Sequence, residues 1–151
     1  MNIYMGSDHA GFQLKEAVKA FLRQHRYNVI DVGTNSTKSV NWAEFGAKAA
    51  QDVSDNHTNS IGIIICGSGI GMSIVSNKFK NIRAALCRDE YDAEMARKHN
   101  NANILNLGER VTEVNKAISI VKTFLNTDFE AGRHQERLNY LHNIVEENNF
   151  K

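Results

Sequence analysis

The sequence predicts an α/β protein in which helices cover both faces of a parallel sheet. Short apolar segments alternate with longer amphipathic segments along the whole chain, which is the pattern of strands and helices in strict succession. The apolar segments at 61–65 and 104–107 show no alternation with polar residues, as is typical of strands buried on both faces. The 151 residues contain no linker, repeat or low-complexity tract, so we expect one domain over residues 1–151.

Five strands and six helices are expected, and they alternate until the last helix. The strands are expected at 2–6, 28–32, 60–66, 84–87 and 103–107, and the helices at 12–25, 42–55, 70–77, 89–99, 113–125 and about 132–148. In the first helix, Leu14, Val18 and Leu22 recur at helical spacing, whereas Lys15 and Lys19 belong to the other side. No strand follows the sixth helix, so we expect it to dock elsewhere, for instance on a partner subunit.

Composition and charge exclude several classes of protein. Basic and acidic residues nearly balance, at 18 and 17, so charge gives no reason to expect a nucleic-acid or membrane-surface partner. No apolar segment approaches the roughly 18 residues of a membrane span. Residues 1–11 do not have the basic and apolar pattern of a secretory leader, so we expect none.

Cys87 and three of the six histidines are not expected to form special sites. Two cysteines are too few for a disulfide framework, which predicts reduced thiols in a cytoplasmic protein. Cys87 is expected to pack as a small buried apolar residue. His25, His57 and His142 lie in polar surroundings and are expected at the surface. No spacing of Cys, His and carboxylate residues is typical of a metal site, so we expect no metal.

Polar side chains gather in the loops that follow the expected strands. In an open parallel sheet, ligands bind at the carboxyl ends of the strands. The loops at 6–11, 66–71 and 108–110 follow the first, third and fifth strands and carry most of the polar chemistry. We therefore expect these three loops to line one cleft.

The loop at 66–71, Cys-Gly-Ser-Gly-Ile-Gly, is the most informative segment of the chain. It joins a buried strand to a helix, and it brings together a thiol, backbone N–H groups and the positive end of a helix dipole. That combination suits a site that binds an anion and moves a proton. A dinucleotide-binding loop is a competing interpretation, because Asp89 lies where a ribose-binding acid is expected, although Met72 replaces the last glycine. The phosphate-binding loop of P-loop NTPases is excluded, because it needs Gly-Lys-Ser/Thr, which is absent here. The loop of cysteine phosphatases is excluded too, because it needs an arginine six residues after its cysteine, where this chain has Met72.

Three further groups each have a functional and a structural interpretation. Asp8 and His9 either cap a helix or contact a sugar hydroxyl and an anionic substrate. His99 either complements the dipole at a helix end or transfers a proton. Arg133 and Arg137 lie four residues apart on one helical face, and they either form surface salt bridges or clamp a phosphate.

Seven segments spread over nearly the whole chain resemble type B ribose-5-phosphate isomerase, the family that also includes the galactose-6-phosphate isomerase subunits. They are Ser-Asp-His-Ala-Gly-Phe at 7–12, Asp-Val-Gly-Thr at 31–34, the loop at 66–71, Ser-Asn-Lys-Phe at 76–79, Arg-Lys-His-Asn at 97–100, Asn-Ile-Leu at 103–105 and Gly-Arg-His at 132–134. Each segment alone is weak, but together and in the family's order they are highly specific. The chain departs from the family at 41–43, where Asn-Trp-Ala replaces the Asp-Tyr-Pro of many members.

The resemblance implies a cofactor-free aldose–ketose isomerase of the pentose phosphate pathway. It also implies a Rossmann-like three-layer α/β/α sandwich that works as a homodimer, or as a tetramer, with active sites shared between subunits. Cys66 is then the base that abstracts the proton, and His99 is the acid that opens the furanose ring, with Asp8 nearby. The groups that hold the enediolate are then Gly67, Ser68, Gly69, Ile70, Gly71 and Asn100. The phosphate contacts are then His9, Arg110, Arg133 and Arg137, some of them from the partner chain.

The identity of the sugar phosphate stays open at this point. Ribose 5-phosphate is favoured because Cys66, His99 and both late arginines occur in one chain, so no complementary subunit is needed. A six-carbon substrate such as allose 6-phosphate or galactose 6-phosphate also fits, because the sequence does not reveal the depth of the pocket. Two different functions would use the same loops: a non-catalytic phosphosugar-binding module and a small nicotinamide-binding protein.

Overall fold

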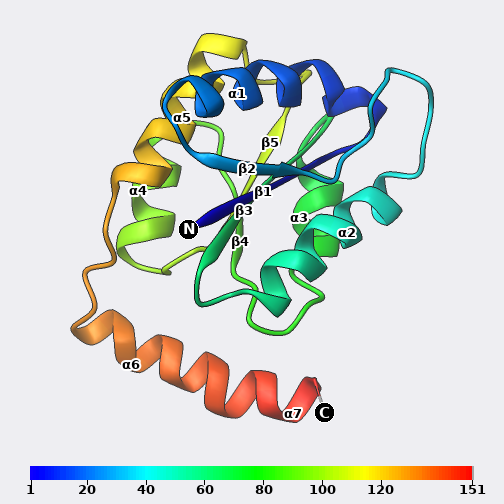
Figure 1. The fold of residues 1–151 in the computed structure, drawn as a ribbon. Coiled ribbons are helices and arrows are strands. Elements are labelled where there is room, and N and C mark those ends of the chain that lie inside the picture. Colours follow the sequence, from blue (N-terminus) through cyan, green and yellow to red (C-terminus); the bar gives the residue numbers. More distant parts are fainter. Residues whose placement is uncertain (151) are drawn as a thin grey trace.

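The structure is a computed structural model that describes residues 1–150, and it has the predicted α/β/α architecture (Figure 1). Its five strands form one parallel sheet in the order β2-β1-β3-β5-β4. The strands are β1 (Asn2–Ser7), β2 (Asn28–Asp31), β3 (Ser60–Cys66), β4 (Ala84–Leu86) and β5 (Ile104–Gly108). The helices are η1 (His9–Gly11), α1 (Phe12–Gln24), α2 (Trp42–Asp55), α3 (Ile70–Ser76), α4 (Glu90–Lys98), α5 (Val114–Asn126), α6 (Arg133–Tyr140), η2 (Leu141–Glu146) and α7 (Glu147–Asn149).

Two apolar cores, one on each face of the sheet, produce the three layers. On one face, α1, α4 and α5 contribute buried residues such as Leu14, Ala93 and Phe124. On the other face, α2 and α3 contribute buried residues such as Val53 and Met72. Strand β3 lies between the two cores and is buried over its whole length, which explains why its sequence does not alternate.

The element boundaries differ from the predictions mainly where side chains cap helices. Asp89 and Glu113 were expected inside helices, but each lies just before its helix and accepts backbone N–H groups from the first turn. The short helix η1 was not predicted. The segment predicted as one helix at about 132–148 contains a π-helical turn, η2, between α6 and α7. None of the helices in residues 1–150 is long and apolar enough to cross a membrane.

The register of the sheet aligns the three loops predicted to carry the chemistry. Ser7 at the end of β1 pairs with Ile65, and Cys66 at the end of β3 pairs with Gly108 at the end of β5. The carboxyl ends of these three neighbouring strands therefore lie side by side. This register places the loops after β1, β3 and β5 at one edge of the sheet.

A buried ion pair joins α1 to the end of β2. Lys15 is only 1% exposed, and its Nζ donates to Asp31 Oδ2 at 2.5 Å, while Lys19 Nζ donates to the same oxygen at 2.7 Å. Burial would raise the pKa of Asp31, but hydrogen bonds from Lys15, Lys19 and the Gly33 N–H outweigh it and lower this pKa. The ionised carboxylate is therefore the form that the fold requires.

Replacing Asp31 with asparagine is expected to lower the free energy of unfolding by about 3–5 kcal/mol, because Lys15 stays buried without its main counter-charge. A carboxyl pKa lowered by folding stabilises the protein above the unfolded-state value and loses that contribution as the pH falls through the folded value. D31N should remove this acid dependence. Urea unfolding at neutral and acidic pH measures both effects. The exposed Asp55 provides the control, and equal stability of D31N and D55N would contradict the prediction.

Candidate active site

A cleft of about 450 Å³ opens at the carboxyl ends of β1, β3 and β5. The three predicted loops meet there, together with the first residue of α2. The lining residues are Asp8, His9, Ala10, Trp42, Cys66, Gly67, Ser68, Gly71, Arg110 and Val111. The loop after β4, with Arg88 and Asp89, does not contribute to it. The cleft therefore gathers one thiol, one carboxylate, one imidazole and one guanidinium group.

Cys66 lies at the point where β3 turns into α3. Its side chain lines the cleft although the residue is only 6% exposed, and the Gly69 N–H donates to Sγ at 3.2 Å. Gly69 has a φ of +81°, and a Cβ there would lie 2.5 Å from Leu86 Cδ1, so this turn requires glycine. The geometry suits a sulfur that accepts a proton from a ligand in the cleft.

Asp8 and His9 combine the two interpretations that the sequence left open. Asp8 Oδ1 accepts the Gly11 N–H at 3.0 Å and so caps η1, yet the residue also lines the cleft. His9 Nδ1 accepts the Val40 N–H at 3.1 Å. Since that nitrogen is an acceptor, the neutral ring carries its proton on Nε2, which makes Nε2–H the donor available to a ligand.

Arg110 brings a positive charge to the cysteine loop. The backbone of the loop after β5 is tied to that loop, because the Arg110 N–H donates to the Gly67 carbonyl oxygen at 2.9 Å. A Cβ on Gly67 would lie 3.0 Å from Arg110 Nη1, so the guanidinium group packs directly over this glycine. The absence of a side chain at position 67 thus lets a cation approach the backbone beside Cys66.

Trp42 forms one wall of the cleft. It begins α2, is 42% exposed, and lies so close to Gly71 that a Cβ there would be 3.0 Å from indole Cε3. Asn41 precedes it and caps α2, with Oδ1 accepting the Ala43 N–H at 2.9 Å. The segment in which this chain departs from the family pattern therefore places an indole next to the cysteine loop.

Some of the predicted site residues do not line this cleft within one chain. Gly69 and Ile70 belong to the cysteine loop but do not face the cleft, and four others lie on different elements: His99, Asn100, Arg133 and Arg137. His99 follows α4 and lies five residues before Ile104, where β5 begins. Ile104 pairs with Gly62, which lies four residues before Cys66 in the neighbouring strand. Four residues of a strand span roughly 13 Å, so the end of β5 that follows His99 lies about that far from the thiol along the sheet. Within one chain, Asp8 therefore lines the cleft and His99 does not, because α4 runs back toward the amino edge of the sheet.

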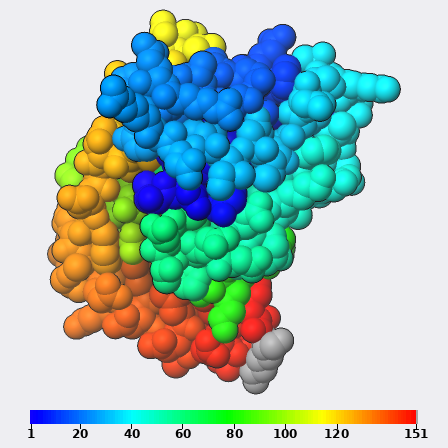
Figure 2. Space-filling view, in the orientation of Figure 1, coloured from blue at the N-terminus to red at the C-terminus, as the bar shows by residue number. Residues whose placement is uncertain are grey.

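Arg133 and Arg137 lie on the exposed side of α6, whereas His134 and Leu138 form its buried side. The segment from α6 to α7 runs along the lower edge of the molecule in Figure 1. Figure 2 shows this orange-to-red segment well separated from the cyan segment that leads into α2. Within one chain, neither arginine lines the cleft that holds His9 and Arg110, the other two predicted phosphate contacts.

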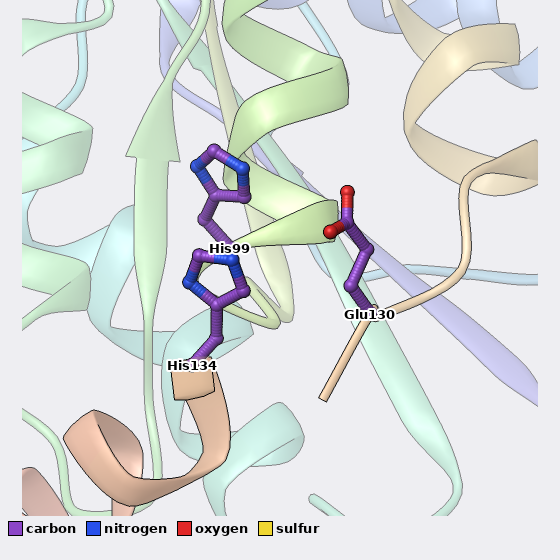
Figure 3. A group of neighbouring side chains, drawn as sticks. All are labelled: His99, Glu130 and His134. Carbon is purple, nitrogen blue, oxygen red and sulfur yellow. The ribbon is translucent and has the colours of Figure 1, made fainter. Parts of the chain in front are cut away.

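His99, Glu130 and His134 form a second group of side chains (Figure 3). The two imidazole rings stack with their centroids 4.3 Å apart and their planes 15° from parallel. The ligand atoms of the three residues lie within 4.8 Å of one another, but the nitrogen lone pairs of the stacked rings lie in two nearly parallel planes, which disfavours both rings binding one ion. Sequence reasoning missed this group because Glu130 and His134 lie more than 30 residues from His99, so no local spacing indicates it.

The other histidines and Cys87 test the remaining predictions. His25 and His57 are exposed, as expected. His142 was expected at the surface, but it is half-buried between Arg83 and Glu146, with its ring nitrogens 3.3 Å from Nη1 and Oε2, respectively. Cys87 is buried as predicted, and burial, with Asp92 and Asp89 nearby, raises its pKa to about 12.

The nicotinamide-binding interpretation loses its main support. Asp89 Oδ1 accepts the Asp92 N–H at 2.8 Å, so the proposed ribose acid serves as a helix cap. The glycine loop follows the central strand β3 rather than the first strand, and Met72 is fully buried in the core. The fingerprint for dinucleotides requires a glycine there and usually follows the first strand of its fold.

Comparisons with known proteins agree with this geometry. Residues 3–141 match the family model described as Ribose/Galactose Isomerase. The ribose-5-phosphate isomerase B of Escherichia coli is 38% identical over 147 residues, which cover 97% of this chain and 98% of that protein. The ribose-5-phosphate isomerase B structure from Clostridium thermocellum superposes with a TM-score of 0.93 and 44% identity, covering 98% and 99% of the two chains. A Mycoplasma genitalium relative with bound ribulose-5-phosphate has a TM-score of 0.93 and 37% identity, covering 97% of each chain.

Proposed function

The chain belongs to the ribose/galactose isomerase family, and on that premise we propose that it interconverts ribose 5-phosphate and ribulose 5-phosphate with Cys66 as the base. The observation that carries the proposal is the thiol of Cys66, which accepts an N–H from its own glycine loop inside a cleft with Asp8, His9 and Arg110. The ribulose-5-phosphate bound to the Mycoplasma genitalium relative supports the choice of substrate.

The proposed reaction moves one proton between neighbouring carbons. The Cys66 thiolate takes the proton from C2 of the open-chain aldose, and the C–H electrons form a C1=C2 double bond while negative charge develops on O1. Backbone N–H groups of the loop at 66–71 stabilise that enediolate. The hydroxyl proton passes from O2 to O1, the thiol returns its proton to C1, and the ketose is formed. No net oxidation occurs, so the reaction requires no redox cofactor.

We propose that the partner subunit completes each site in a homodimer. Ring opening needs an acid, and the phosphate of the substrate needs cations, yet His99, Arg133 and Arg137 lie away from the cleft of their own chain. Two features support the proposal that these side chains act in the cleft of a second copy of the chain. Arg133 and Arg137 are exposed on α6, and Ile70 and Ile74 expose apolar side chains one turn apart on α3, next to the cleft. A two-fold axis would let each chain supply these groups to the other.

We also place the protein in the cytoplasm, within the pentose phosphate pathway, as one domain over the whole chain. Both cysteines are free thiols, which fits a reducing compartment. Ribose 5-phosphate and ribulose 5-phosphate are intermediates of that pathway.

A ketose assay with a panel of aldose phosphates tests the proposed reaction. Ribose 5-phosphate, allose 6-phosphate and galactose 6-phosphate are each incubated with the enzyme, with and without EDTA. We expect the highest kcat/KM for ribose 5-phosphate and no effect of EDTA. Saturable binding without any ketose would identify a non-catalytic phosphosugar-binding module instead.

Trp42 is expected to limit the length of the sugar, since its indole closes the cleft beside Gly71. Replacing Trp42 with alanine should raise the ratio of kcat/KM for allose 6-phosphate over ribose 5-phosphate by about 10-fold. Replacing it with phenylalanine keeps an aromatic wall and should leave the ratio within about twofold. Kinetics on both substrates measure the ratio, and an unchanged value in W42A would show that the indole does not set substrate length.

A further inference from the structure

We propose that His134 is a positioning residue for the isomerase reaction, whose stacked ring holds the His99 imidazole in the orientation that it needs as the acid. The inference rests on the proposed function of His99 as the acid that opens the sugar ring. It assigns a role to the buried side of α6, whose exposed side carries Arg133 and Arg137.

The backbone holds the two rings against each other. His99 ends α4, where its N–H donates to the Met95 carbonyl oxygen at 2.9 Å. The turn that leads into α6 is attached to the same place, because the Glu130 N–H donates to the Lys98 carbonyl oxygen at 3.1 Å. Ala131 and Gly132 then adopt positive φ angles of 57° and 56°, which turn the chain into α6. His134 follows this turn, and its stacked ring is only 6% exposed (Figure 3).

Burial and the charges around His134 disfavour its protonation. Burial lowers the pKa of His134, and the neighbouring His99, Arg133 and Arg137 lower it further, while Glu130 opposes them. Lys98 also lies beside this group, but its ammonium pairs with Glu94. Two imidazolium rings with centroids 4.3 Å apart would repel each other. A neutral His134 presents an aromatic face to the His99 ring, which is a favourable arrangement.

The consequence is a fixed orientation for the acid. A ring-opening acid must direct its N–H at one oxygen of the sugar, and a misplacement of about 1 Å can cost up to about 100-fold in rate. His99 is half-buried, and without His134 the ring face that it stacks on would have no aromatic partner. The stack therefore restrains the orientation of the His99 imidazole. Positioning of this kind affects kcat rather than substrate binding.

Steady-state kinetics on ribose 5-phosphate separate this role from a direct phosphate contact. H134A removes the stack and should lower kcat about 10-fold with little change in KM. H134F keeps a flat uncharged ring and should restore kcat to within about threefold of the wild type. H25A is the matched control, because the His25 ring also contacts an aromatic ring, that of Phe21, with centroids 4.2 Å apart, but is tilted by 39° and lies exposed at the end of α1. A raised KM with unchanged kcat in H134A, or an H134F as slow as H134A, would overturn the proposal.

A second measurement needs no turnover. In ¹³C-histidine-labelled protein, nuclear Overhauser effects between the ring protons of His99 and His134 should be strong in the wild type, because the stacked rings have centroids 4.3 Å apart. Their absence in the wild type would overturn the proposal even if H134A proved unfolded. If the panel of aldose phosphates produced no ketose, the proposed function would fail, whereas these ring contacts would still show the stack.

Discussion

Cys66→Ala is expected to lower kcat on ribose 5-phosphate by at least about 10³-fold, because the variant loses the group that accepts the C2 proton. The substitution removes one small side chain at the edge of the core, so the free energy of unfolding should fall by no more than about 2 kcal/mol. Enzyme kinetics and urea unfolding of the same preparation measure the two effects separately.

Cys87→Ala provides the matched control for this variant. Both cysteines are free and buried, but Cys87 lies outside the cleft and its pKa is raised to about 12. C87A should therefore keep its kcat while losing comparable stability. Iodoacetamide should modify Cys66 and leave Cys87 intact, and the substrate should protect Cys66. More than about 1% of wild-type kcat in C66A would exclude the thiol as the base.

Activity is expected to return when two inactive variants are combined in one dimer. One chain carries C66A, and the other carries H99A with R137A, so each homodimer lacks part of every site. In a heterodimer, one of the two sites combines Cys66 of one chain with His99 and Arg137 of the other. Co-expression should form heterodimers as roughly half of the population, which gives about one quarter of wild-type activity.

Different tags on the two chains allow the heterodimer to be purified and assayed alone, where about half of wild-type activity is expected. Homodimers mixed after purification, under conditions without subunit exchange, form the negative control. A purified heterodimer as inactive as its parents would contradict shared sites. The prediction depends on the separation of His99 and Arg137 from the cleft within one chain.

Local sequence patterns were enough to predict the layers and the cleft. The apolar segments without alternation became the buried strands β3 and β5, and helical spacing located α1 from Leu14, Val18 and Leu22. Since the carboxyl ends of parallel strands share one edge, the loops after β1, β3 and β5 could be assigned to one cleft from the order of elements alone.

Helix capping and ring stacking, unlike the layers and the cleft, could not be predicted from local sequence patterns. An aspartate at position 89 suits a ribose-binding site and a helix cap equally well. Only the hydrogen bond from the Asp92 N–H to Asp89 Oδ1, at 2.8 Å, decides between the two roles. The stack of His99 on His134 joins two helix ends that are 35 residues apart, so no spacing in the chain indicates it. Trp42 became a wall of the cleft only because Gly71 leaves room for its indole.

The sequence by itself determined the succession of strands and helices along the chain and the thiol at the end of the third strand, because each of these depends on residues close together in the chain. Seven short segments, each local but together spread over nearly the whole chain, identified the family to which the chain is similar. The tertiary structure decided which of the functional side chains meet. It placed Cys66 with Asp8, His9 and Arg110 at the carboxyl edge of the sheet, and His99 with His134 toward the other edge. The physical reason is that an α-helix following a parallel strand returns to the opposite edge, so residues at its end are carried away from the cleft that its strand approaches.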